Sequence, residues 1–266
     1  MNRIVKSPSN QLEECLQCNA RAQCSIGKLT IDNIGKFPKA FFHSTMLQEG
    51  QYLFRKGDPL SHIYSLKLGS IKSEMNLQDG IGQVTHFSLP GESLGLDGIA
   101  NRQHQVDTIS LAESKVCSIP FDNLKKMELE FPALRGGIEN SLGKLLNISN
   151  IHIYNLINLN ALEKLADFLL DYSNRLGSVG FDRDNFNLPM NRVDLASYLG
   201  VKIETLSRSI NQLEKINAIV THNRQIKFLS RKPIFKIIDS NLLREKHAIS
   251  KSENTAYPIN LEKRNL

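Results

Sequence analysis

The sequence predicts an α+β protein in which a short cysteine-rich segment precedes an antiparallel β-roll, a long helix and a C-terminal winged helix-turn-helix. Between residues 42 and 120, glycines separate short β-prone segments. From Pro132, apolar residues recur at spacings of three and four. Between residues 190 and 230, two short helical patterns joined by Gly200 precede two β-prone runs. We therefore expect parts at 1–30, 31–131, 132–160 and 161–238, followed by a flexible tail at 239–266.

The composition indicates a globular protein of the cytoplasm. The chain has 266 residues, of which 41% are hydrophobic and 23% are charged, as is typical of folded domains. No apolar run reaches the roughly 20 residues of a membrane-spanning helix, so no membrane contact is expected. The N-terminus lacks the apolar segment of a secretory signal. Disulfides are rare in the cytoplasm, so the four cysteines are expected to be metal ligands, redox groups or small buried side chains.

The first part, residues 1–30, contains three of these cysteines. Cys15, Cys18 and Cys24 lie close together, and Cys117 follows in the predicted β-roll. Thiolates are soft ligands that zinc and iron–sulfur clusters prefer. Four of them suffice for a zinc ion or for a [4Fe–4S] cluster. The spacing by itself leaves a zinc site, a cluster and unrelated thiols open.

The second part, residues 31–131, has the pattern of a compact antiparallel roll. It lacks the long helices that a βαβ enzyme would have between its strands. The chain contains no Walker-type glycine loop and no HExxH. Its seven histidines are scattered, and none stands beside a plausible nucleophile. We therefore expect a binding protein, with an enzyme that carries a regulatory β-roll as the alternative from another class.

Residues 132–160 predict a long helix that pairs with its copy in a homodimer. Pro132 suits a helix start, and three heptads follow without a further proline. Two heptad-like registers are possible, and both place Ser149 on the seam. One register contains Ile138, Leu142, Leu145, His152, Leu156 and Leu159. The other contains Leu142, Leu146, Ile153 and Leu156. The expected interface comprises Leu142, Leu146, Ser149, Ile153 and Leu156. A helix that packs only on its own domain would show a similar pattern.

The C-terminal part predicts a nucleic-acid-binding unit. Residues 164–266 contain 17 basic and 11 acidic residues, whereas residues 1–163 are neutral overall. This concentration of positive charge suits a polyanion such as nucleic acid, although a solvated surface would also explain it. A second helix over 202–216 has an apolar face and a polar face that presents Glu204, Ser207 and Arg208. We expect these three to read base edges of double-stranded DNA, and Lys202 and Arg192 to hold phosphates.

From Cys15 to about Leu229, the sequence resembles the Crp/Fnr family of bacterial transcription regulators, and within it the oxygen-sensing FNR branch. The cysteines match FNR in number and in all their spacings. The segments 64–72 and 90–97 look like the family's β-roll, which is of the cyclic-nucleotide-binding type. The segment 198–208, with its Glu-x-x-Ser-Arg pattern, is similar to the FNR recognition region.

This resemblance implies a mechanism. A [4Fe–4S] cluster on Cys15, Cys18, Cys24 and Cys117 would favour a homodimer that binds DNA. Oxygen would convert the cluster to [2Fe–2S], favour monomers and release the DNA. The resemblance also implies half-sites close to TTGAT in an inverted repeat with a four-base gap, RNA polymerase as a partner, and control of genes for anaerobic metabolism.

Two residues depart from the family's pattern. Gln23 stands where FNR proteins have an apolar residue that would shelter the cluster. Ser149 stands where the family often has an aspartate, whose charge would repel its copy in the dimer.

The alternative within the same fold is a Crp-like regulator that responds to a cyclic nucleotide and has no cluster. Glu92 could hold the ribose in such a pocket, but the Arg-Ser pair for the cyclic phosphate is missing, and Arg102 is a weak substitute.

Overall fold

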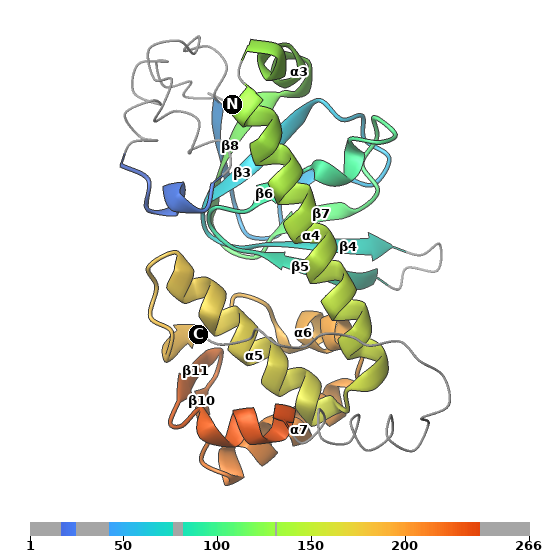
Figure 1. Ribbon diagram of the computed structural model, residues 1–266. Helices are drawn as coiled ribbons and strands as arrows, with labels where there is room; N and C mark the ends of the chain where they lie inside the picture. Colours follow the sequence, from blue (N-terminus) through green and yellow to red (C-terminus); the bar gives the residue numbers. More distant parts are fainter. Residues whose placement is uncertain (1–16, 25–42, 77–81, 131, 240–266) are drawn as a thin grey trace, which may run out of the picture.

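Two four-stranded antiparallel sheets form the N-terminal β-roll of the computed structural model (Figure 1). The structure describes residues 17–24, 43–76, 82–130 and 132–239. The first sheet has the order β1–β8–β3–β6, with β1 (His43–Leu47), β8 (Ser114–Pro120), β3 (His62–Leu68) and β6 (Ser93–Leu94). The second has the order β2–β7–β4–β5, with β2 (Tyr52–Phe54), β7 (Asp107–Ser110), β4 (Ile71–Asn76) and β5 (Gly82–Ser88).

Alternation along the strands gives the first sheet two apolar faces. Leu66 and Val116 point into the roll, where they form a buried cluster with Ile71 of the second sheet. Ile63 and Ile119 point outward and are covered by two helices. Two short 3-10 helices belong to the same half of the molecule, η1 (Asn19–Ala22) and η3 (Leu96–Gly98). The outer face of the first sheet is therefore buried against helices rather than exposed to water.

The covering helices are α3 (Phe121–Glu130) and α4 (Pro132–Asn158). The sequence pattern does not predict α3. It predicts a change of period at Pro132, which is the residue at which α4 begins. Leu124 of α3 and Leu134 of α4 are buried together against the sheet. The helix α4 has 27 residues, which corresponds to a length of about 40 Å. It runs alongside the β-roll and ends beside the C-terminal part (Figure 1).

The C-terminal unit, which we define as α5 to β11, is a winged helix-turn-helix. It contains α5 (Ala161–Ser178), β9 (Asn185–Asn187), α6 (Arg192–Leu199), α7 (Ile203–Lys215), β10 (Ile219–His222) and β11 (Gln225–Phe228). Asn160 and Glu163 form a capping box that starts α5. Gly200 has φ +63 between α6 and α7, a conformation that glycine adopts without strain. The strands pair in the order β10–β11–β9. The predicted α+β fold is thus confirmed.

The C-terminal unit shares a hydrophobic core with the β-roll. Val84 and Phe87 of β5 belong to the same buried cluster as Leu165 and Leu169 of α5. Burial of this apolar surface holds the unit against the roll. In the described ranges, no helix is both long and apolar enough to cross a membrane. The predicted tail lies outside the described residues from position 240 onward.

Candidate functional site

Two cysteines that are distant in the sequence lie close together on the outer face of the first sheet. Cys117 of β8 is directly opposite Ser65 of β3 in the antiparallel pair, so their side chains share one face. The Sγ atom of Cys24 lies 3.1 Å from the Oγ atom of Ser65. Cys18 is the N-cap residue of η1 and is half-buried, whereas Cys15 lies outside the described residues. The segment after Cys18 therefore brings a second thiol to the face that carries Cys117.

The surroundings of Cys117 fit an iron–sulfur group. Ser44 of β1 lies opposite Cys117 on its other side, and its buried Oγ atom has no hydrogen-bond partner among the described residues. Buried hydroxyls normally have a partner, and a hydroxyl here could donate to a sulfur atom. The thiols of Cys18, Cys24 and Cys117 are soft donors. Within the described ranges, no three His, Cys, Asp or Glu side chains gather as a metal site.

The second candidate site is the exposed face of α7. Leu206, Ile210 and Leu213 are buried in the core that the C-terminal unit shares with the roll. The side chains expected to contact DNA, Glu204, Ser207 and Arg208, all lie on the exposed face. Ile203, which the sequence placed on the apolar face, is 40% exposed because it stands on the first turn of the helix. The helix can therefore present its polar face to a groove while its apolar face stays packed.

Hydrogen bonds within α7 restrain two of these side chains. Ser207 donates from Oγ to the carbonyl oxygen of Ile203 at 3.0 Å. Arg208 donates from Nη2 to Oγ1 of Thr205 at 3.1 Å. A guanidinium has five N–H donors, so Arg208 keeps further donors for a base edge. The polar face thus carries one fixed guanidinium and one carboxylate, Glu204, a turn apart.

The two predicted phosphate-binding residues flank α7. Lys202 is its N-cap residue and is exposed. Arg192 begins α6 and donates from Nη2 to the carbonyl oxygen of Asn223, in the turn between β10 and β11, at 3.3 Å. Partial burial lowers the pKa of Arg192 from its usual value, although a guanidinium remains charged in proteins. Arg192 therefore connects the start of α6 to the wing.

The long helix α4 has an inward and an outward apolar stripe. Ile138 is buried, and Leu145 packs on the same core beneath the helix. The outward stripe contains Leu142 (37% exposed), Leu146 (64%), Ile153 (55%) and Ile157 (75%), with the exposed Ser149 between them. The sequence showed two competing registers because both stripes are apolar.

Leu156, the fifth residue of the expected interface, lies at the edge of the outward stripe. It is half-buried and lines a cavity together with Tyr198 and Leu199 of α6 in the same chain. His152, one turn earlier, stacks on Tyr198 with ring centroids 4.1 Å apart. This end of α4 therefore packs on the C-terminal unit, while Ile157 rather than Leu156 extends the outward stripe.

The residues that a cyclic-nucleotide pocket would need are engaged elsewhere. The Glu92 carboxylate accepts two hydrogen bonds from Nη2 of Arg175, at 2.7 Å and 3.0 Å. Arg102 forms an ion pair with Asp122 at 3.3 Å and lies over the ring of Phe121. Glu92, which would hold the ribose, is therefore already engaged by Arg175 in this structure, and Arg102 lies at the surface.

A β-roll, a long helix with an exposed apolar stripe and a winged helix-turn-helix with a polar reading face together define a DNA-binding transcription regulator. Residues 163–233 match the Crp-like helix-turn-helix domain, and residues 45–129 match the Cyclic nucleotide-binding domain. The chain is 32% identical over 212 residues to the Anaerobic regulatory protein of Pasteurella multocida, covering 80% of this chain and 78% of that protein. It is also 32% identical to the Fumarate and nitrate reduction regulatory protein of Yersinia pestis, covering 80% and 85%.

Among solved structures, FixK2 from Bradyrhizobium japonicum has the same fold, with a TM-score of 0.69 at 24% identity over 74% of this chain and 96% of that one. The chain belongs to the Crp/Fnr family of transcription regulators, in its FNR-type branch. It is an FNR-like global regulator of transcription.

Proposed function

We propose that this regulator senses oxygen through a [4Fe–4S] cluster held by Cys15, Cys18, Cys24 and Cys117. The observation that carries the proposal is the contact of Cys24 with Ser65, the cross-strand neighbour of Cys117. The orphaned hydroxyl of Ser44 on the other side of Cys117 supports a sulfur-rich group at this face. When bound, the cluster would supply reactivity toward oxygen. The cysteines would hold residues 15–24 against the sheet, and their release would free that segment.

The proposed output is a change in homodimerisation. Several large apolar side chains of the outward stripe of α4 are exposed in the single chain. Such exposed apolar surface favours pairing with the same helix of a second copy. Leu142, Leu146, Ser149 and Ile153 would lie at this interface, with Leu156 at its edge. The inward stripe of the same helix packs on the sheet that carries Cys117. A change at the cysteines could therefore alter the position of α4 without a further messenger.

The dimer would bind double-stranded DNA as an inverted repeat of TTGAT-type half-sites. Arg208 can donate twice to a guanine, and Glu204 can accept from the paired cytosine. Ser207 would contact a neighbouring base, and Lys202 and Arg192 would hold phosphates. RNA polymerase would be the partner at the genes for anaerobic metabolism. In this proposal the protein works in the cytoplasm, catalyses no reaction and has the domain limits given above.

The decisive experiment measures iron, sulfide and visible absorbance in anaerobically purified protein. We expect a brown protein whose cluster is lost from Cys117→Ser, since a serine hydroxyl is a harder and much less acidic donor. Ser118→Ala is the matched control, because Ser118 is the next residue of β8 and points to the opposite face. Full iron and unchanged absorbance in Cys117→Ser would disprove the four-cysteine site. A colourless wild-type protein containing zinc would favour the zinc reading instead.

A further inference from the structure

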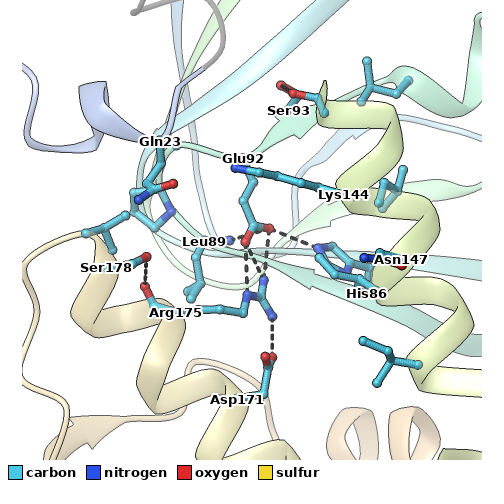
Figure 2. A pocket seen from close by; sticks show the side chains of 18 residues that line it. Gln23, His86, Leu89, Glu92, Ser93, Lys144, Asn147, Asp171, Arg175 and Ser178 are labelled. Atoms are coloured by element: carbon cyan, nitrogen blue, oxygen red, sulfur yellow. Dashed lines mark hydrogen bonds and ion pairs between the residues drawn. The ribbon is translucent and has the colours of Figure 1, made fainter. Parts of the chain in front are cut away.

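A half-buried ion pair joins the β-roll directly to the C-terminal unit. Arg175 of α5 donates from Nε and Nη2 to Oε1 of Glu92, at 3.1 Å and 2.7 Å. The same Nη2 group donates to the carbonyl oxygen of Phe87 at 2.6 Å. His86 Nε2 lies 3.0 Å from Oε2 of Glu92, and Asp171 lies 3.5 Å from Nη1 of Arg175. Figure 2 shows Arg175 reaching from α5 to Glu92, with His86 approaching from β5.

This contact combines several short hydrogen bonds with low exposure to water. The side chains of Arg175 and Glu92 are only 17% and 28% exposed. Burial alone would raise the pKa of Glu92, but the charge of Arg175 and the hydrogen bond with His86 lower it to about 2. The carboxylate is therefore charged at any physiological pH. Loss of one partner would leave the other buried without its counter-charge, which is costly, and a bidentate contact restrains direction as well as distance.

The ion pair adjoins the cysteine segment. Glu92 follows Gly91, whose φ is +94. A Cβ atom on Gly91 would lie 2.7 Å from Cβ of Gln23 and 3.1 Å from the carbonyl oxygen of Ala20. The turn that carries Glu92 can approach the cysteine segment this closely only because residue 91 has no side chain. Gln23 in turn immediately precedes Cys24 and lines a cavity of about 350 Å³ with Glu92 and Arg175 (Figure 2).

The remaining contacts between the two parts leave the reading face of α7 free. Lys72 of β4 pairs with Asp194 of α6 at 2.7 Å. The backbone N–H of Val84 donates to Oγ of Ser197 at 3.0 Å. These two contacts involve α6, whereas Arg208 of α7 stays exposed. The docked orientation is therefore compatible with DNA binding.

We propose that Arg175 and Glu92 are positioning residues that set the orientation of the C-terminal unit on the β-roll, at the turn that touches the cysteine segment. The inference rests on the proposed dimer and its inverted repeat. Two units held in fixed orientations can engage both half-sites at once at one separation, and this simultaneous binding raises the affinity. Without the pair, the units would tolerate several separations and bind each of them less well.

The test uses full-length anaerobic protein and DNA duplexes in which the gap between two TTGAT-type half-sites varies, together with a duplex that has one half-site. The variants are Arg175→Gln, Glu92→Gln and Arg175→Lys. Lys164→Gln is the control, because it removes the same charge from the first turn of the same helix. Absorbance and sedimentation show whether the cluster and the dimer persist, and Glu92→Gln decides the outcome if Arg175→Gln does not fold.

We expect wild type and Lys164→Gln to prefer the four-base gap by roughly tenfold or more. Arg175→Gln and Glu92→Gln should lose most of this preference, with unchanged binding to the single half-site, and Arg175→Lys should recover part of it. A sharp preference that persists in folded Glu92→Gln would overturn the positioning role. A wild-type protein without any gap preference would instead refute the inverted repeat proposed above.

Discussion

Leu146 offers a direct test of the proposed dimer, because it is exposed while its neighbour Leu145 packs inward. Leu146 is 64% exposed in the single chain, whereas Leu145 packs against the core beneath α4. Leu146→Ala removes apolar surface from the outward stripe and leaves the inward stripe intact. If the outward stripe meets a second copy, this substitution should weaken the dimer without unfolding the chain.

The magnitude follows from the exposed fraction. Full burial of a leucine contributes about 1.5–3 kcal/mol. Pairing can bury at most the 64% of Leu146 that is exposed, or about 1–2 kcal/mol for each copy. Alanine would keep roughly a third of this, so the two copies in a dimer would lose about 1.5–2.5 kcal/mol. The dimer dissociation constant should then rise by about 10- to 100-fold.

Anaerobic sedimentation over a range of protein concentrations would measure this constant. Leu145→Ala is the matched control: it should lower the unfolding temperature, because it leaves a cavity in the core, and change the dimer constant much less. Iron content in both variants would show that the cluster site is intact. If Leu146→Ala dimerises as tightly as wild type, the interface lies elsewhere and the reasoning from the exposed stripe is wrong.

Two further expectations concern DNA sequence preference and pH. Arg208→Ala should cost about 1–3 kcal/mol on the cognate duplex and flatten the preference at its G·C pair. Lys215, the exposed last residue of α7, is expected to hold a phosphate, so Lys215→Ala should weaken binding to all sequences alike. Equal losses of Arg208→Ala on every duplex would contradict base reading. Burial, together with the charges of His86 and Lys164, lowers the pKa of His152 from 6.5 to about 4, so the unfolded chain takes up a proton at higher pH than the folded one. Stability should therefore fall by about 1–2 kcal/mol as the pH drops from 6.5 toward 4, less than the full shift would give because solvent screens the half-buried ring. Denaturant titrations of His152→Phe should show a smaller fall.

The sequence by itself determined the elements whose signals are local. The spacing of Leu206, Ile210 and Leu213 predicted a helix with one apolar face, because residues three and four apart share a side of any α-helix. Gly200 identified the turn before it, since glycine alone adopts a left-handed conformation without strain. The short β-prone runs after the helix predicted the wing. In these cases neighbouring residues carry the information, so no knowledge of distant contacts was needed.

The sequence could not choose the outward face of α4 or find α3. Both registers of α4 are apolar because one packs on the β-roll and the other is exposed, and periodicity does not say which surface a stripe will meet. The short helix α3 ends at Glu130 and α4 begins at Pro132. Because the two helices are so close in the chain, the sequence pattern did not separate them. Only the position of the first sheet showed that Leu145 is inward and Leu146 outward.

The contacts that connect the parts were decided by the tertiary structure alone. Ser65 beside Cys24, Ser44 opposite Cys117, and Arg175 on Glu92 all join residues that are far apart in the chain. Their partners depend on strand order and on how the C-terminal unit docks, and neither leaves a periodic signal. An arginine on α5 looks like any exposed charge in the sequence. It becomes a link between the two parts because the shared apolar core brings α5 beneath the turn that carries Glu92.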